Sequence, residues 1–106
     1  MKDVVSLGAN EVSVRIKRVL LEALKPRESS IIDLSKSLCS VEGIDECGIV
    51  VVDVDVKTET VKLTLRGHSV DYDAVLKIME QQALSIKGID EIDVEKVKPP
   101  VKTAPK

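Results

Sequence analysis

The sequence predicts an α+β fold in which two helices pack on one face of a four-stranded antiparallel sheet. Three observations predict it: an internal repeat, segments in which apolar and polar residues alternate, and segments in which apolar residues recur at helical spacing. The repeat is the phrase Val41–Glu46, which returns 45 residues later as Ile86–Glu91. Each copy is predicted to end a helix and to open a strand, so the chain divides into two similar halves.

The repeat also predicts the order of the strands. A shift of 45 residues superimposes the apolar positions of one half on those of the other, so each half is predicted to be a strand–helix–strand unit. Right-handed crossovers within the units and a hairpin between them give a βαββαβ chain with the sheet order 4-1-3-2. This is a ferredoxin-like sandwich with both helices on one face.

The predicted strands differ in their apolar patterns. The first, over residues 14–25, is apolar on both faces and ends at Pro26, which cannot donate to the ladder. The second covers residues 44–57, and a turn at residues 57–59 leads into the third. Both alternate with a period of two, which is typical of a half-buried strand. The fourth is predicted within residues 84–97.

The register of the first strand is ambiguous in the sequence. The repeat aligns Arg18 with Leu63, a core-facing position, whereas simple alternation turns Val19 and Leu21 inward. A bulge, or a slip of one residue, would reconcile the two patterns, because either one exchanges the faces of the side chains beyond it.

Both helices are predicted from a capping residue and an apolar stripe. Ser29 or Ser30 caps the first helix and Gly43 ends it, while Asp71 caps the second. The predicted buried stripes are Ile31, Leu34, Leu38 and Val41 in the first helix, and Val75, Leu76, Met79 and Ala83 in the second.

Length and composition predict one domain over residues 14–98, with a flexible leader at 1–13 and a disordered Lys/Pro tail at 99–106. Tyr72 is the only aromatic residue and the net charge is −2. Base stacking and phosphate binding are therefore poorly supported, and no nucleic-acid partner is predicted. Because no apolar run fits a membrane span and no secretory signal is evident, a cytoplasmic protein without a membrane partner is expected.

The face of the sheet that the helices leave open is expected to be partly apolar. Both Val19–Leu21 and Ile49–Val52 are apolar on both sides. Apolar surface left in water costs roughly 25 cal/mol per Å², and a large exposed patch usually marks an interface. The sequence therefore predicts a homo-oligomer formed through the open sheet face or the edge strands. The alternative is that the leader or the tail folds back over the patch.

Several stretches also carry a resemblance to a known family. They are Leu24–Pro26 followed by Ser30–Ile32, the pair Gly43-Ile44, and the stretch from Asp53 to Glu59 followed by Val61–Leu63. Over about residues 15–97 the chain resembles a small archaeal family called domain of unknown function 211.

The resemblance implies a ferredoxin-like fold, an oligomeric ring and no established activity. The family shows His and then Pro after Lys-Pro, where this chain has Arg27 and Ser29. A role for that His therefore does not carry over to this chain.

Three acids in the predicted strands are candidate metal ligands: Glu22, Asp53 and Asp55. Strands disfavour Asp, and alternation places Asp53 and Asp55 on one face, which Glu22 shares in one of the two registers of the first strand. Clustered carboxylates suit Ca²⁺ or Mg²⁺. The alternative is cross-strand pairing of these acids with Lys62 and Arg66.

A second candidate site lies at the start of the first helix, where Lys25, Arg27, Ser29 and Ser30 cluster. The free N–H groups and the dipole of a helix N-terminus attract anions, so a small anionic ligand is expected there. The alternative is that these residues only cap the helix.

The sequence carries no catalytic motif, and it predicts a non-enzymatic oligomer that binds a small ligand or a divalent cation, with a regulatory role. His68 has no catalytic partner specified by the sequence, and is expected to be a solvated turn residue. The alternatives are an acylphosphatase-like hydrolase and an RNA-binding module. The only Asn is Asn10, in the leader, which disfavours the hydrolase, and the strands lack the aromatic residues that stack RNA bases.

Overall fold

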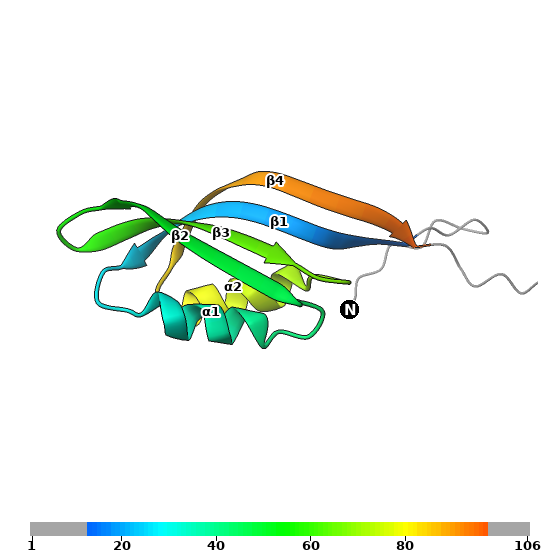
Figure 1. Cartoon of the computed structure of the whole chain (residues 1–106), viewed down its shortest axis with the longest axis horizontal. Coiled ribbons are helices and arrows are strands. Elements are labelled where there is room, and N and C mark those ends of the chain that lie inside the picture. The colour runs from blue at the N-terminus through cyan, green and yellow to red at the C-terminus, as the bar shows by residue number, and fades with distance from the viewer. Residues whose placement is uncertain (1–12, 98–106) are drawn as a thin grey trace, which may run out of the picture.

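The computed structural model describes residues 13–97, so the predicted leader, up to residue 12, and the predicted tail at 99–106 lie outside it. Its elements alternate as βαββαβ, and all three strand pairs are antiparallel. The sheet order β2-β3-β1-β4 is the predicted one, and both helices lie beneath one face of the sheet (Figure 1). The ferredoxin-like sandwich is confirmed. The elements are β1 (Ser13–Pro26), α1 (Ile31–Cys39), β2 (Glu46–Val54), β3 (Thr58–Arg66), α2 (Tyr72–Gln81) and β4 (Ser85–Val97).

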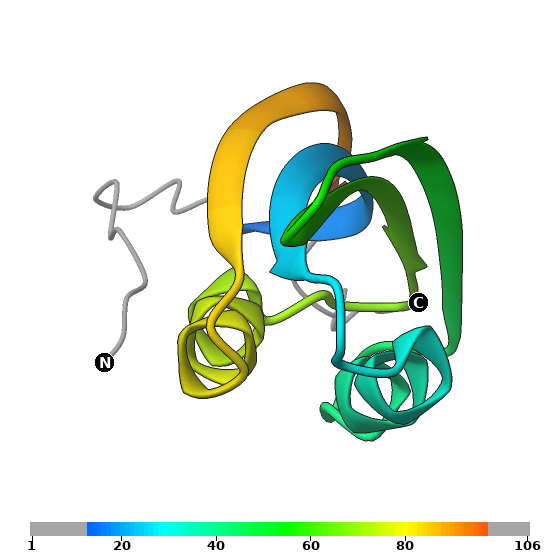
Figure 2. The same cartoon turned by 90° about the vertical axis from the view of Figure 1, so that its left-hand side faces the viewer.

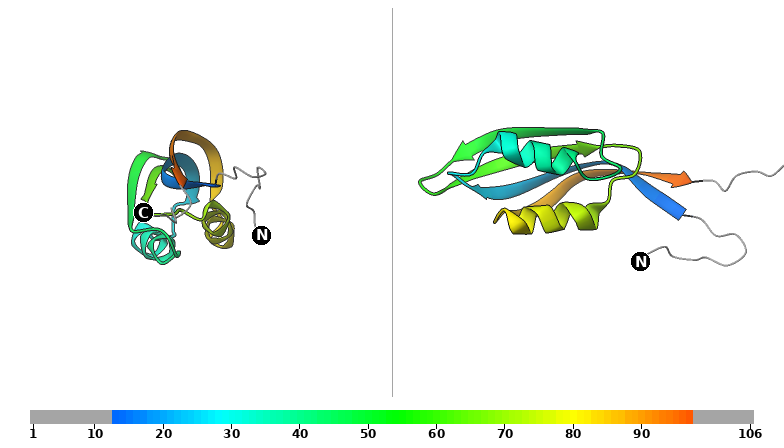
Figure 3. Two further views of the ribbon diagram at one scale, coloured as in Figure 1. Left: turned by 90° about the vertical axis from the view of Figure 1, so that its right-hand side faces the viewer. Right: turned by 90° about the horizontal axis from the view of Figure 1, so that it is seen from below.

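The core fills the space between the sheet and the helices. The sheet curls over the two helices as an arch (Figure 2), and the view from below shows both helices against it (Figure 3). Short aliphatic side chains fill this space, because the chain holds a single aromatic residue. The buried members are Val19, Leu21, Ala23, Leu34, Leu38, Ile44, Val61, Leu63, Leu65, Val70, Val75, Met79 and Leu84.

The register of β1 follows simple alternation beyond a bulge. Val19 lies opposite Leu65 on β3, and both side chains are fully buried. Between its partners on β4, β1 carries one extra residue, Lys17. This bulge lets Ile16 pack against the core as well. The alignment of Arg18 with a core position, which the repeat predicts, is therefore wrong, and Val19 and Leu21 face the core as simple alternation predicts.

The first helix begins and packs as predicted but ends earlier. Ser30 caps α1, since its hydroxyl accepts the backbone N–H groups of the residues two and three positions on. Leu34 and Leu38 are fully buried. Val41 lies beyond the end of the helix, although its half-buried side chain still contacts the core.

The second helix buries only part of its predicted stripe. Val75 and Met79 are fully buried, and the Asp71 carboxylate caps the helix as predicted. Leu76 is 36% exposed, and Ala83 is exposed beyond the end of the helix, so both predictions are wrong. Neither helix of the described chain is long and apolar enough to cross a membrane.

A tight turn at Ala83 explains why the repeat fails in the second half. Ala83 has a φ of 63°, and the N–H of Leu84 donates to the Met79 carbonyl at 2.8 Å, which closes the helix. The chain therefore enters β4 at Ser85, and the second copy of the repeated phrase lies inside a strand. The first copy does connect a helix to a strand, as predicted.

A bulge in β2 separates two residues that alternation predicts on one face. Val51 lies opposite Val61, but Asp53 lies opposite its neighbour Thr60, because Val52 is an extra residue. Asp53 is therefore on the open face of the sheet, away from the face of Val51. The strand is also shorter than predicted, and the hairpin turn covers residues 55–57 instead of 57–59.

Two glycines hold the loop before β2 against the loop after β3. Gly43 has a φ of +94°, and a Cβ atom on it would lie 1.9 Å from the Ser69 carbonyl oxygen. A Cβ atom on Gly67 would lie 1.9 Å from the Gly43 carbonyl oxygen. The two loops therefore meet backbone to backbone, which no larger residue allows.

We expect Gly67→Ala to lower the free energy of unfolding by about 2 kcal/mol, because the new methyl group forces the two backbones apart. Urea unfolding followed by circular dichroism measures this loss. Gly48→Ala is the matched control, since a Cβ atom on Gly48 meets nothing within 4 Å. Equal stability of the two variants would contradict the close contact.

Candidate functional site

A cavity of about 480 Å³, hereafter the end cavity, opens where β1 passes into α1. Figure 2 looks onto this end of the molecule, where the hairpin, the start of α1 and the turn into β4 come together. Its volume lies within the range of small-molecule sites. The lining residues are Leu24, Lys25, Pro26 and Glu28 from β1 and the loop after it, Val56, Lys57 and Thr58 from the hairpin, and Ala83 and Ser85 from the turn before β4.

Backbone contacts hold the walls of the end cavity together. The N–H of Arg27 donates to the Lys57 carbonyl at 2.8 Å, which ties the loop after β1 to the hairpin. Leu24 lies opposite Ser85 in the ladder between β1 and β4, which fixes the third wall. The shape of the cavity therefore follows from the backbone.

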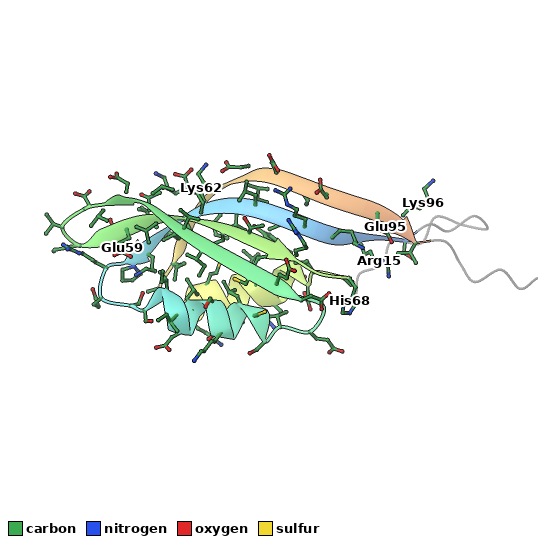
Figure 4. All side chains as sticks on the ribbon, in the orientation of Figure 1. Arg15, Glu59, Lys62, His68, Glu95 and Lys96 are labelled. Carbon is green, nitrogen blue, oxygen red and sulfur yellow. The ribbon has the colours of Figure 1, made fainter. Side chains whose placement is uncertain are left out.

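Lys25 is one of the lining residues of the end cavity, although its side chain is fully buried. Its Nζ lies 3.0 Å from a carboxylate oxygen of Glu59, donates to the Pro26 carbonyl at 2.7 Å, and donates to the Ser29 carbonyl. Figure 4 shows Glu59 at this end of the sheet. Burial of an ammonium group is tolerated only with such partners, so the charge of Lys25 is already bound by the protein itself.

The other residues predicted to bind an anion do not line the end cavity. The Ser29 hydroxyl donates to the Pro26 carbonyl at 3.1 Å, and the Ser30 hydroxyl caps α1. Arg27 is exposed. The structure therefore places Lys25 in the cavity wall and uses the two serines to hold the loop and the helix start, as in the capping alternative.

Sequence reasoning missed the charged residues Glu28 and Lys57, which do line the end cavity. The topology of the predicted fold could have indicated these two residues. In a βαββαβ sheet, the loop after the first strand and the hairpin after the second strand reach the same end. Charged residues in those two turns are thus expected to face a common space.

Glu22, a predicted metal ligand, lies among lysines on the open face of the sheet. Its two carboxylate oxygens lie 3.8 Å from Lys62 Nζ and 3.6 Å from Lys87 Nζ. Lys62 is on the outer side of the sheet in Figure 4, and also lies 2.9 Å from Asp90. The hydrogen bond that Lys62 donates to the Asp90 carboxylate is the main cause that raises the pKa of Lys62.

The structure does not bring Asp53 and Asp55 together with Glu22. Asp53 is on β2, and β3 separates it from β1, which carries Glu22. Asp55 lies in the hairpin turn, where its carboxylate accepts the N–H of Val56 at 3.2 Å. Over residues 13–97, no three His, Cys, Asp or Glu side chains are grouped to hold a metal ion. The cation site stays a prediction.

The comparison with known proteins identifies the family. The family model described as uncharacterised ArCR, domain of unknown function 211, matches residues 17–98, which is most of the chain. The chain belongs to this family. A relative in Methanocaldococcus jannaschii, named uncharacterized protein MJ0319, is 39% identical over 77 residues, which cover 73% of this chain and 79% of the relative. The resemblance seen in the sequence is thereby confirmed, and neither name assigns an activity.

In this family member, His68 follows β3 at the end of that strand away from the hairpin (Figure 4). The His68 Nδ1 atom lies 3.4 Å from an Asp45 carboxylate oxygen, and both side chains are exposed. A smaller cavity of about 300 Å³ adjoins them, with Lys17, Glu46 and Arg66 also in its wall. Opposite charges pair with one another here, since Arg66 lies 3.6 Å from Glu46 and not beside the acids predicted as its partners.

The two thiols differ in their surroundings. Burial, and to a lesser extent the neighbouring Cys39, raises the pKa of Cys47 to about 11. The Cys47 thiol therefore stays protonated at neutral pH, which makes it a poor nucleophile and a poor metal ligand. Cys39 is exposed at the end of α1.

We expect Lys25→Met to lower the free energy of unfolding by about 3 kcal/mol, because it leaves the Glu59 carboxylate and two carbonyls without their partner. Thermal or urea unfolding measures the loss. Lys62→Met is the control, since it removes only solvent-exposed ion pairs, with Glu22 and Asp90, which contribute little to stability. Adding Glu59→Gln to Lys25→Met should recover part of the loss. Similar losses for Lys25→Met and Lys62→Met would contradict the role of the buried pair.

Proposed function

We propose that this protein is a non-enzymatic, cytoplasmic binding protein for a small charged ligand, that it works as a homo-oligomer, and that its role is regulatory. The end cavity is the observation that supports the ligand. It combines apolar side chains with charged ones, which is the usual composition of a site that holds a small molecule and fixes its orientation.

The surroundings of the reactive side chains favour binding over catalysis. The ammonium of Lys25 is bound by Glu59 and by two carbonyls, so it is poorly suited to act as a base or as a nucleophile. The Cys47 thiol is protonated, and His68 lies at the other end of the sheet from the end cavity. The groups that line the cavity are suited to holding charge and apolar surface.

A divalent cation, Ca²⁺ or Mg²⁺, at Glu22, Asp53 and Asp55 is the other ligand that the sequence predicts. Binding there would require the Glu22 carboxylate to give up two lysine partners and Asp53 to reach across β3. The small ligand of the end cavity is therefore the better supported proposal.

Homo-oligomerisation is supported by exposed apolar side chains on both edge strands. On β2, Val50 is 60% exposed and Val52 is 49% exposed. On β4, Ile89, Ile92 and Val94 are each about half exposed. Edge strands also present unpaired backbone groups. Because the two edges differ, contact between them is head-to-tail, and such contacts close into a ring when the rotation allows.

We expect small carboxylates, amines or amino acids to bind at the end cavity. In ¹H–¹⁵N correlation spectra of the full chain, titration with such compounds should shift the amide signals of Lys57, Thr58, Ala83 and Ser85. Parallel titrations with CaCl₂ and MgCl₂ test the other ligand. Shifts centred on Glu22 and Asp53 with the cations, and none at the end cavity with any organic ion, would overturn the small-ligand proposal.

We expect native mass spectrometry to detect a homo-oligomer that a charge on either edge strand disrupts. Val50→Glu places an acid opposite Lys62, and Ile92→Lys places a base at a half-exposed position of β4, so neither charge is fully buried in the folded subunit. Ile32→Lys is the control, since Ile32 is 62% exposed but lies on α1. A monomeric parent, or dissociation by the control alone, would contradict association through the edges.

A further inference from the structure

Two exposed charged residues of opposite sign line the end cavity and form no ion pair with the charged groups of residues 13–97. Glu28 and Lys57 both line it. Neither lies within ion-pair distance of the other, nor of any other charged group in residues 13–97. The third charge, on Lys25, is matched by Glu59 at 3.0 Å. The charges around the end cavity thus balance, and two of them face solvent instead of an ion-pair partner among residues 13–97.

The backbone keeps Glu28 and Lys57 close together. The N–H of Arg27, the residue before Glu28, donates to the carbonyl of Lys57 at 2.8 Å. The two charged residues therefore flank one hydrogen bond between the loop after β1 and the hairpin. Their side chains start from neighbouring backbone segments, both line the end cavity, and they form no ion pair with one another, so both can contact a ligand in that space.

Apolar atoms form the rest of the wall. Leu24, Pro26, Val56 and Ala83 all line the end cavity. A purely polar or inorganic ion would leave this surface in contact with water, whereas a short hydrocarbon group would cover it. A ligand that matches this wall therefore needs an apolar group as well as charged groups.

We propose that the ligand of the end cavity is a small zwitterion with an apolar side chain, of the chemical class of the aliphatic α-amino acids. Its carboxylate pairs with the Lys57 ammonium, its ammonium pairs with the Glu28 carboxylate, and its side chain covers the apolar wall. This inference rests on the proposed function and names the class of ligand that the function requires.

The two opposite charges also explain discrimination against simpler ions. A carboxylate without an ammonium would satisfy Lys57 but lie beside an uncompensated Glu28, and an amine without a carboxylate would do the reverse. The purely anionic ligand expected from the sequence therefore fits the end cavity less well than a molecule that carries both charges.

Three compounds with one skeleton test the inference by calorimetric titration of the full chain: L-leucine, 4-methylpentanoate and 3-methylbutylamine. The last two lack the ammonium and the carboxylate of leucine, respectively. We expect leucine to bind at least tenfold more tightly than either, since tenfold corresponds to about 1.4 kcal/mol, within the contribution of one hydrogen bond to a charged group.

Variants assign each charge to its residue. Lys57→Met should weaken leucine binding about tenfold without weakening the amine, and Glu28→Gln should weaken leucine binding about tenfold without weakening the carboxylate, because each change removes the like charge beside the simpler ion. Lys36→Met and Glu80→Gln are the controls, because both residues lie on helices and neither lines the end cavity. Unchanged leucine binding in Lys57→Met or in Glu28→Gln would overturn the assignment.

The outcomes separate this inference from the function on which it rests. Equal binding of 4-methylpentanoate and leucine, lost in Lys57→Met, would overturn the zwitterion and keep a small-ligand site. Equal binding of 3-methylbutylamine and leucine would do the same with the opposite charge. Binding of none of the three would overturn the inference, and the wider spectral titration would then decide the small-ligand function.

Discussion

The buried ammonium of Lys25 is the constraint on which this end of the molecule depends. Three segments supply its partners: the end of β1 gives a carbonyl, the loop before α1 gives another, and β3 gives the carboxylate of Glu59. An ammonium inside a protein is tolerable only when all its donors are used. These segments must therefore stay close together, and their closeness fixes where α1 starts and where the hairpin meets the loop after β1. The partners of the Lys25 ammonium and the backbone contact between Arg27 and Lys57 thus hold the same segments together around the end cavity.

The charged side chains on the open face of the sheet are arranged differently from those of the end cavity. On the open face, acids and bases of β1, β3 and β4 lie within ion-pair distance of one another, as Glu22 does with Lys62 and Lys87. Such exposed pairs contribute little to stability and leave little charge for a ligand. At the end cavity, by contrast, Glu28 and Lys57 lie in one wall without such partners among the described residues. The end cavity thus differs from the open face of the sheet because two of its charged side chains have no ion-pair partner among the described residues.

The sequence predicted the fold because periodicity and topology are local or nearly local properties. The alternation of Val61, Leu63 and Leu65, and the cap at Asp71, needed no knowledge of distant contacts. The predictions failed where one residue was inserted or a turn tightened. The bulge at Val52 moved Asp53 to the other face, and the left-handed turn at Ala83 placed the second copy of the repeat inside β4. The site was largely missed, because Glu28 and Lys57 lie 29 positions apart and become neighbours only through a backbone hydrogen bond.

The extra residue Val52 in β2 decides which face of the sheet the following side chains occupy. Strand side chains alternate with a period of two. The extra residue Val52 therefore places Asp53 on the face opposite to the one that alternation from Val51 predicts. Loss of Val52 would remove the bulge and leave Asp53 opposite Thr60, on the face that it already occupies, without changing a ladder elsewhere in the sheet. A single-codon deletion at Val52 would thus straighten this edge strand without exchanging the side chains near the end cavity, while the core on the other three strands stays as it is.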